Sequence, residues 1–448
     1  MTKPAPDFSA RSIWTLALPA LGSLVIEPAL ILIDTFMIGH LGTMPLAGLS
    51  LASTVLTTVV GVFVFLAYST TGAVARATGA GNQREAISAG AQALWLAGLL
   101  GVLAMILLLA LASPLLFALG ATGEVHRQAV WYLRSSAPGL IGMFVILSAN
   151  GLLRGLLDTR TPLRVLAWGA LGNVAVNVVL IYVLNWGIIG AGIGVSLAQN
   201  GMAIALVWAI IKVARQERAS LRPQLAGIGK SFGEGIPLLV RTIALRAAIL
   251  MTTATITRIG ATSLAANQVA NSIWQIFQFG LDSLAIAAQG LIGVAVGAKD
   301  RQAIRFGSRR LIWWGISASV ILGLLLAVTS RWLTPWLTGD PEVQHSASLS
   351  LVIIGILMPI AGWAYLLDGI LIGAGETKFM AISSVTMVAA YAPVLVAIWW
   401  WANLHQPLSI GQEMWVFLAI CLAYNGWMSL VRVALNQFRV HRISSAVT

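Results

Sequence analysis

The 448-residue sequence has little charge and almost no cysteine. Asp, Glu, Lys and Arg together make up 9% of the residues, against about 25% in an ordinary soluble protein. So few charges cannot cover the surface of a globular chain of this length, which excludes a soluble enzyme, a disordered protein and a nucleic-acid-binding domain. The single cysteine, Cys421, excludes an intramolecular disulfide framework and a cysteine-based zinc site.

Hydrophobic residues take the place of the missing charges and make up 58% of the sequence. A helix needs about 20 mostly apolar residues to cross a bilayer, and we find twelve such runs. They lie at 12–38, 46–75, 87–112, 127–153, 163–184, 188–212, 232–257, 262–296, 311–333, 346–373, 380–402 and 412–435. The sequence therefore predicts an all-α polytopic membrane protein with twelve transmembrane helices.

Lys and Arg are distributed unevenly between the predicted loops. Of the 27 basic residues, 21 fall on the side of the membrane that holds both termini, Arg432 among them, and 4 fall on the other side. The other two, Arg241 and Arg246, lie inside the seventh run. Because cytoplasmic loops carry an excess of Lys and Arg, we expect both termini in the cytoplasm. The membrane thus explains the net charge of +12 without nucleic acid.

The two halves of the sequence match at a fixed offset of 218 residues. The matches fall at helix ends and loops. They include Pro19 with Pro237, Gly72 with Gly290, Gly79-Ala80 with Gly297-Ala298, Asn82 with Asp300, Asn150-Gly151 with Asp368-Gly369, and Gly155 with Gly373. Six spans in each half make the repeat parallel, which is a transporter architecture. We expect an N-terminal six-helix lobe over 1–212, a cytoplasmic linker over 213–231 and a C-terminal six-helix lobe over 232–448.

Two carboxylates lie seven positions apart in the first run and so share one face of a helix. The side chains of Glu27 and Asp34 would both face the interior of an apolar lobe, where proton uptake by a carboxylate could couple to transport. The alternative is that one is permanently neutral and only bonds a neighbour. Pro19 and Pro28 interrupt the same helix and permit a bend that protonation could change, or a fixed kink that only packs.

Amide side chains form a second polar group in the first half. Asn173 and Asn177 are one helical turn apart in the fifth run, and Asn150 ends the fourth. Such amides could line a polar cavity that binds a cation or substrate, or they could join two helices.

The eighth run carries a polar stripe along one helix face. Its members follow helical spacing and are Asn267, Asn271, Gln275, Gln278, Asp282 and Gln289. Lipid cannot accept such a stripe, so it must face a water-filled cavity or another polar helix. Similar predicted depths suggest an ion pair between Arg246 and Asp282, and another between Arg241 and Asp368.

Short motifs in both halves give a family resemblance that covers essentially the whole chain. They are Ile33-Asp34-Thr35, Ile38-Gly39-His40-Leu41-Gly42, Gly79-Ala80-Gly81-Asn82, Leu153-Arg154-Gly155, Asp158-Thr159-Arg160-Thr161-Pro162, Leu281-Asp282 and Tyr365-Leu366-Leu367-Asp368-Gly369. In their order and spacing they resemble the multidrug and toxic compound extrusion (MATE) family, and most closely its DNA-damage-inducible F (DinF) branch.

The resemblance implies a V-shaped pair of six-helix lobes that exports organic compounds in exchange for H⁺ or Na⁺. Asp34 matches the aspartate thought to couple ions in the N-terminal lobe. Asn177 stands where several relatives have Asp. Asp368 matches an acid used by the NorM branch, whereas Asp282 fits the DinF pattern.

We therefore expect a monomeric secondary transporter in the inner membrane of a prokaryote. It would export lipophilic, often cationic compounds by proton-coupled antiport, with Na⁺ as the other candidate coupling ion. Surrounding membrane lipid is the other partner, and no cofactor, metal or catalytic residue is expected.

A lipid-linked precursor flippase is the alternative function. Arg241 and Arg246 lie in one lobe only, which weighs against it. An intramembrane enzyme would need paired Asp clusters or a zinc-binding helix, and neither occurs. A channel would need a filter segment, which the sequence lacks.

Overall fold

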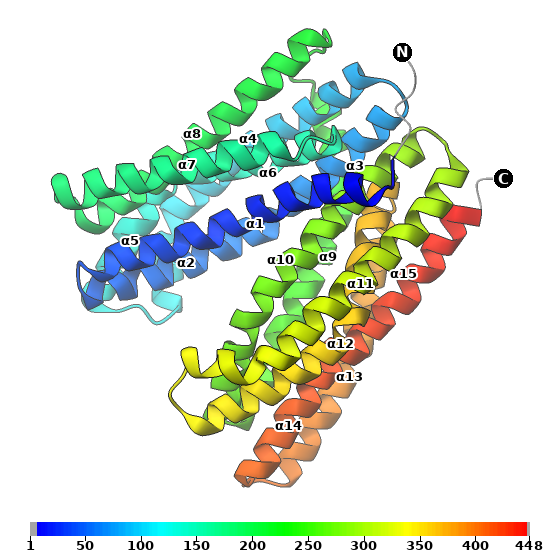
Figure 1. Cartoon of the computed structure of the whole chain (residues 1–448). Coiled ribbons are helices and arrows are strands. Elements are labelled where there is room, and N and C mark those ends of the chain that lie inside the picture. Colours follow the sequence, from blue (N-terminus) through cyan, green and yellow to red (C-terminus); the bar gives the residue numbers. More distant parts are fainter. Residues whose placement is uncertain (1–6, 446–448) are drawn as a thin grey trace. The chain divides into compact units, whose positions relative to one another are not determined.

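A computed structural model describes residues 7–445, and within that range the chain is helical and contains no strand (Figure 1). The α-helices are α1 (Ala10–Gly39), α2 (Thr43–Phe63), α3 (Phe65–Gly79), α4 (Gln83–Ala118), α5 (Gly123–Ser136), α6 (Gly139–Gly155), α7 (Arg160–Val178), α8 (Gly187–Gln216), α9 (Leu225–Ile259), α10 (Ala261–Gly297), α11 (Arg301–Leu333), α12 (Pro341–Ala374), α13 (Thr377–Leu404), α14 (Ile410–Leu422) and α15 (Met428–Ser445). Two short π-helices, Val179–Val183 and Ala423–Trp427, and a 3₁₀ turn, Thr334–Trp336, complete the described elements.

Eleven spans of the described chain are long and apolar enough to cross a membrane. A twelfth is the pair α5 and α6, which bends by 53° at a short break. This pair occupies the predicted fourth span, 127–153. Pro138 stands at the break, where its ring and its missing N–H prevent an uninterrupted helix. The prediction of an all-helical membrane protein with twelve spans is confirmed once the bent pair counts as one span.

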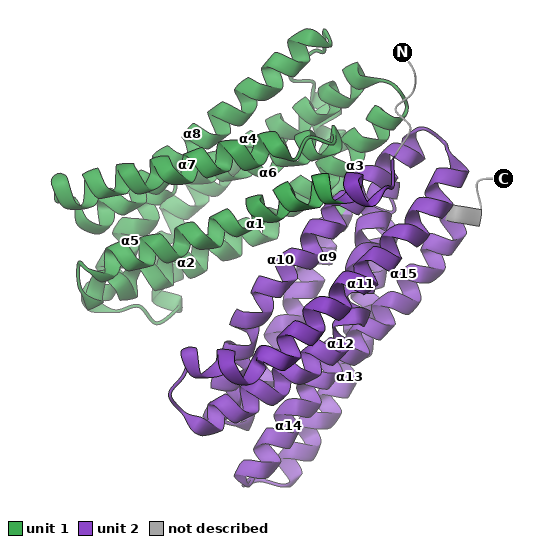
Figure 2. Ribbon diagram, in the orientation of Figure 1, with its two compact units in different colours: residues 1–5, 14–236 green, residues 6–13, 237–448 purple. Residues whose placement is uncertain are grey.

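The chain divides into two compact units (Figure 2). Of the described residues, unit 1 contains 14–236, and unit 2 contains 237–445 together with 7–13 at the start of the chain. Helix α1 therefore contributes to both units, and it runs without a break through Pro19 and Pro28. Phe8 is buried in unit 2, where its ring lies against Gly307 of α11.

One helix in each unit packs against at least three others. In unit 1, α6 packs against α3, α4 and α8, and in unit 2, α12 packs against α10, α11 and α15. These two helices contain the repeat-related residues Asn150 and Asp368. Each unit thus builds its core around an equivalent helix.

Equivalent glycines make the close helix contacts of both cores. A Cβ atom at Gly151 would lie 2.6 Å from the carbonyl oxygen of Ala67, and one at Gly369 would lie 2.4 Å from that of Ala285. Gly151 and Gly369 are 218 residues apart, and so are Ala67 and Ala285. Small residues allow membrane helices to approach this closely, so the two units repeat a backbone contact as well as a sequence pattern.

The loops also repeat their helix caps. Asn82 accepts a hydrogen bond from the backbone N–H of Glu85 at the start of α4, and Asp300 accepts one from Ala303 at the start of α11. Both positions follow repeat-related glycines that end α3 and α10. Side-chain caps satisfy backbone donors that a helix leaves free at its first turn.

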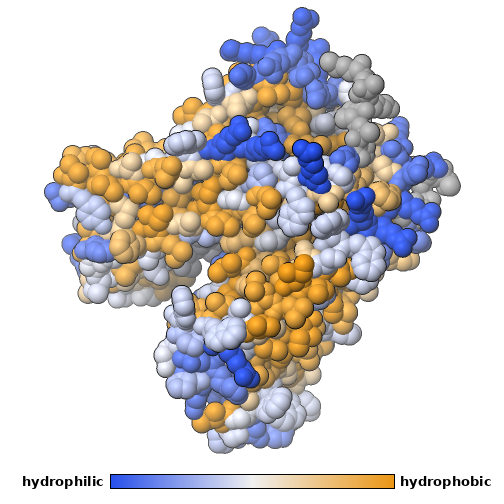
Figure 3. All heavy atoms as spheres, in the orientation of Figure 1, coloured by the Kyte–Doolittle hydropathy of each residue, from blue (hydrophilic) through white to orange (hydrophobic). Residues whose placement is uncertain are grey.

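The outer surface of each unit suits a bilayer. Hydrophobic side chains cover the middle of the helices on the face shown in Figure 3, and hydrophilic side chains gather towards the helix ends. Many large apolar side chains of the described chain are exposed, including Leu32, Trp168 and Ile321. A soluble surface would not carry so many.

Candidate functional site

Asp34 is the polar centre of unit 1. It lies near the end of α1 and is 7% exposed. Asn177 donates a hydrogen bond from Nδ2 to Asp34 Oδ1 at 2.8 Å. Among the described residues, no lysine or arginine forms an ion pair with Asp34. Neutral groups alone would therefore hold a negative charge at this position.

Gly194 of α8 provides the space for the Asn177 side chain. A Cβ atom at Gly194 would lie 1.8 Å from Asn177 Oδ1. That oxygen is buried without a hydrogen-bond donor, while Nδ2 also donates to Asn173 Oδ1 at 3.4 Å. The two amides of the fifth span therefore extend the polar group that begins at Asp34.

Glu27 does not share the environment of Asp34. Its side chain is exposed, and no described residue gives it a hydrogen bond or an ion pair. The two carboxylates therefore differ in accessibility, because only Asp34 is buried. Helical spacing places two residues on one face but does not tell how closely neighbouring helices pack along that face.

Asn150 is buried on α6, and its Oδ1 atom has no hydrogen-bond partner. No described hydrogen bond joins it to Asp34, Asn173 or Asn177. Unit 1 therefore presents two separate unsatisfied amide oxygens, on Asn150 and Asn177. Each is an acceptor that a cation, a donor group or a water molecule could satisfy.

Tyr132 and Tyr182 also belong to this region, although no sequence pattern marks them as site residues. Tyr132 is 4% exposed on α5 and lies close enough to interact electrostatically with Asp34. The hydroxyl of Tyr182 donates to the carbonyl oxygen of Met37 at 2.7 Å, which joins the π-helix after α7 to α1. Such π-helical segments are frequent beside functional sites.

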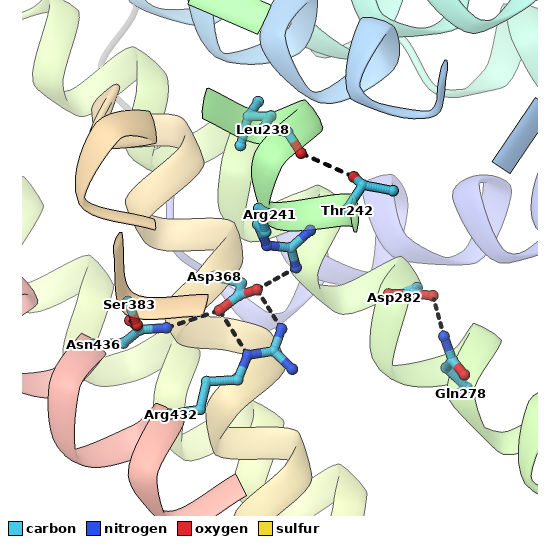
Figure 4. Close-up of polar contacts among 9 residues, drawn as sticks. All are labelled: Leu238, Arg241, Thr242, Gln278, Asp282, Asp368, Ser383, Arg432 and Asn436. Atoms are coloured by element: carbon cyan, nitrogen blue, oxygen red, sulfur yellow. Dashed lines mark hydrogen bonds and ion pairs between the residues drawn. The ribbon is translucent and has the colours of Figure 1, made fainter. Parts of the chain in front are cut away.

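Asp368 is the polar centre of unit 2 (Figure 4). It lies on α12 and is 4% exposed. Arg241 from α9 and Arg432 from α15 both form ion pairs with its carboxylate. Asn436 Nδ2 donates to Asp368 Oδ1 at 2.9 Å, and Ser383 Oγ donates to Asn436 Oδ1 at 2.7 Å. Three helices therefore meet at one buried carboxylate, and α13 joins the cluster through Asn436.

The predicted pair of Arg241 and Asp368 is present, whereas the role of Arg432 was missed. Loop counting placed Arg432 with the basic residues of the cytoplasmic side, but its side chain is 14% exposed and binds Asp368. Its guanidinium also lies 5.3 Å from the ring centre of Tyr365. For a single basic residue near the end of the last span, the sequence does not indicate whether its side chain is buried beside an acidic residue or solvated in a loop.

The predicted pair of Arg246 and Asp282 is wrong. Arg246 is exposed, and Asp282 accepts a hydrogen bond from Gln278 at 3.5 Å on its own helix. The positive charges that act on Asp282 are those of Arg241 and Arg432. Matching depth along two helices says nothing about the direction in which each side chain points.

The polar stripe of α10 is uneven in its surroundings. Asn271 and Gln275 are exposed, Gln278 and Asp282 are partly buried, and Gln289 is 2% exposed in the core. The stripe therefore passes from an accessible surface into the helix packing of unit 2. No three His, Cys, Asp or Glu side chains of residues 7–445 gather as a metal site would require.

The position of unit 2 that corresponds to Asp34 is occupied by an uncharged pair. Asp34 aligns with Thr252 and Asn173 with Tyr391 in the repeat. The hydroxyl groups of Thr252 and Tyr391 form a buried hydrogen bond at 2.7 Å. The repeat thus preserves a polar contact between the first and fifth helices of each unit while it changes the groups that form it.

The sequence repeat is also visible in the comparison with known families. The MatE family model matches the chain twice, over residues 19–179 and 237–399. The matches begin at Pro19 and Pro237, which the repeat aligns, and together they cover well over half of the chain. The chain belongs to the MATE family. As a MATE protein it is a membrane transporter of the multidrug and toxic compound efflux class, not an enzyme.

Relatives of this MATE protein occur in bacteria. The DNA damage-inducible protein F of Escherichia coli is 28% identical over 446 residues, which cover 96% of this chain and 93% of that protein. The multidrug resistance protein NorM of Burkholderia vietnamiensis is 26% identical, over 93% of this chain and 92% of that protein. The resemblance to MATE proteins, with a DinF relative, is confirmed.

Solved structures share the fold. The Vibrio cholerae MATE transporter VcmN in its bent form superposes with a TM-score of 0.83 at 20% sequence identity, over 97% of this chain and 98% of that chain. This likeness concerns the fold alone. The helical architecture described above is the one found in the MATE transporters.

Proposed function

We propose that this MATE transporter exports lipophilic organic cations in exchange for protons, and that Asp34 is the coupling carboxylate. The single observation that carries the proposal is the burial of Asp34 without a basic partner. An isolated buried charge is costly in an apolar interior, whereas a protonated carboxyl is tolerated. Either a bound proton or a bound cation removes the cost of the negative charge on Asp34. A proton can therefore displace a cationic substrate from this site, and the substrate can displace the proton.

The exchange follows from this competition. Proton binding to Asp34 would neutralise the site and weaken its hold on a cationic substrate, and proton release would restore it. Asn177 is the candidate to assist this step from α7, because its amide donates a hydrogen bond to Asp34. Na⁺ is the other candidate coupling ion, since oxygen ligands are available on Asp34, Asn150 and Asn177.

The orientation and location are part of the same proposal. The excess of Lys and Arg in alternate loops supports cytoplasmic termini, and the bacterial relatives support an inner membrane. We further propose that residues 1–212 and 232–448 act as two lobes joined by the segment 213–231, and that the protein works as a monomer.

A lipid-linked precursor flippase remains the second candidate, because unit 2 contains a third internal arginine, Arg432, that the sequence did not reveal. Asp368 engages both Arg241 and Arg432, however, so their charge is largely satisfied inside the unit. This arrangement favours a structural role for these arginines over capture of an anionic lipid precursor.

Efflux from proteoliposomes tests the proposal. An imposed pH gradient should drive transport of a fluorescent lipophilic cation by the wild type, with or without Na⁺, and Asp34→Asn should abolish it. Glu27→Gln is the comparison on the same helix and should retain efflux, since Glu27 is exposed.

Three results would count against the proposal. Efflux that is driven by a Na⁺ gradient and not by a pH gradient would show that Na⁺ is the coupling ion. Efflux that survives in Asp34→Asn would move the coupling to unit 2, where Asp282 and Asp368 lie. A wild type that moves no cation under either gradient would favour the flippase.

A further inference from the structure

A basic pocket lies at one end of unit 2, apart from the Asp368 cluster. It has a volume of about 400 Å³ and lies between α11, α12 and α15, which pack against one another in this unit (Figure 1). Its polar lining consists of Arg305, Ser308, Arg309, Gln437 and His441. No carboxylate contributes to the lining. The pocket is therefore positively charged along one wall.

The two arginines of the pocket have no acidic partner. Arg305 and Arg309 lie one turn apart on α11, both are exposed, and neither forms an ion pair with a described residue. Arg439, on the neighbouring α15, pairs instead with Glu376 at 2.8 Å. At this end of the unit, the positive charge of Arg439 is therefore compensated, whereas the charges of Arg305 and Arg309 are not.

Ser308 supplies the observation that points to a ligand. It is 4% exposed, it lines the pocket, and its Oγ atom has no hydrogen-bond partner. Serine in a helix usually bonds a carbonyl oxygen one turn earlier, as Ser319 does with Gly315 on the same helix. A buried hydroxyl without a partner is unusual in a native structure and remains available to a group inside the pocket.

Gln437 is oriented by a tryptophan of the pocket. Trp363 Nε1 donates to Gln437 Oε1 at 3.1 Å, so the amide NH₂ group of Gln437 remains as a donor. The pocket thus offers two guanidinium groups, an amide donor and a hydroxyl. A phosphate group, with several acceptor oxygens and negative charge, matches such a set of donors.

The surroundings favour a lipid as the source of that phosphate. Trp313, which also lines the pocket, is 61% exposed on α11, whose following turns expose large apolar side chains such as Ile321. Tryptophan is enriched where membrane helices pass the headgroup layer. Basic pockets between transmembrane helices at that level bind anionic headgroups.

We propose that this pocket binds the phosphate of an anionic phospholipid, with Arg305 and Arg309 as the charged ligands and Ser308 and Gln437 as neutral ones. The acyl chains would lie along the apolar surface of α11. The site is separate from the transport residues proposed above, and its existence does not depend on the coupling ion or on the substrate.

Lipid retention by the full-length protein tests this site. Purified protein would be equilibrated with mixed micelles containing phosphatidylglycerol or phosphatidylcholine, and bound lipid would be counted by native mass spectrometry. We expect the wild type to prefer phosphatidylglycerol by about 30-fold, since each of the two arginines near a headgroup contributes about 1 kcal/mol. Arg305→Gln with Arg309→Gln should abolish that preference.

Two control variants separate the pocket from general charge. Arg301→Gln with Arg310→Gln removes the same charge from α11 outside the pocket and should keep the preference. Ser308→Ala, which leaves both arginines in place, should reduce the preference by a smaller factor. A thermal unfolding scan of each variant without added lipid shows that it remains folded.

Three outcomes would overturn the proposal. Equal retention of both lipids by the wild type would show that no anionic site exists. An equal loss in the control pair would show that overall charge, and not the pocket, attracts the lipid. Displacement of bound phosphatidylglycerol by millimolar inorganic phosphate would make the pocket a site for a soluble anion instead.

Discussion

Unit 1 and unit 2 enclose carboxylates of opposite character, on helices that the repeat does not align with each other. Asp34 in unit 1 is held by the amide of Asn177 and by no cation. Asp368 in unit 2 is held by two guanidinium groups and an amide. The repeat aligns Asp34 with Thr252 and Asp368 with Asn150, so neither unit repeats the carboxylate of the other.

This difference separates a group that can change charge from one that cannot change charge easily. A carboxylate without a counter-ion can gain a proton with little disturbance of its neighbours. A carboxylate between two arginines would leave two buried positive charges behind if it lost its own, which is strongly unfavourable. The duplicated fold thus provides one unit with a candidate coupling group and the other with a structural ion cluster.

The largest effect should follow from breaking the cluster of unit 2. Asp368→Asn keeps the size of the side chain but leaves Arg241 and Arg432 without their partner. We expect the free energy of unfolding to fall by about 3–5 kcal/mol, the range for removal of one partner from a buried ion pair. Thermal unfolding in detergent, followed by tryptophan fluorescence, measures the change.

The same measurement on Asp34→Asn provides the contrast. No cation loses a partner there, so the stability of this variant should be unchanged or higher. Adding Arg432→Gln to Asp368→Asn should recover part of the lost stability, since it removes one of the stranded charges. If Asp368→Asn is as stable as the wild type, the cluster does not have the structural role assigned to it.

A smaller effect should follow from crowding Asn177. Gly194→Ala would place a Cβ atom 1.8 Å from Asn177 Oδ1 and force the amide to move away from Asp34. A hydrogen bond to a charged group contributes about 1.5–3 kcal/mol. We therefore expect pH-driven efflux to fall by about 10-fold, as measured in the same proteoliposomes.

Gly201→Ala is the control for this change, because a Cβ atom at Gly201 on the same helix has nothing within 4 Å. It should transport like the wild type. Full efflux by Gly194→Ala, with its fold intact, would show that the contact between Asn177 and Asp34 does not influence transport.

Much of the architecture could be predicted from the sequence because it depends on local composition. Apolar runs of sufficient length predict spans, and glycines at a fixed offset predict equivalent packing, as Gly151 and Gly369 show. The bend at Pro138 also has a local cause, although the sequence alone gave the fourth span as one run.

The partners of buried groups could not be predicted in the same way. Arg241 and Asp368 were paired by depth, but the same reasoning gave the wrong partner for Asp282 and overlooked Arg432. Depth along a helix is a one-dimensional quantity, whereas ion pairing depends on helix rotation and on which helices adjoin. Glu27 shows the same limit, since its spacing from Asp34 is helical but its environment differs.

The smallest effect should come from the uncharged counterpart of the Asp34 site. Tyr391→Phe removes the hydrogen bond with Thr252 and leaves both side chains nearly unchanged in volume. A neutral hydrogen bond contributes about 1 kcal/mol in water and about 0.6 kcal/mol between membrane helices. We expect a stability loss of this size and unaltered pH-driven efflux. This result would show that a polar contact at the equivalent place in unit 2 can be removed without loss of transport. The role of Asp34 would then depend on its charge and not on its polar contact alone. Efflux that falls as far in Tyr391→Phe as in Asp34→Asn would instead assign coupling to both units.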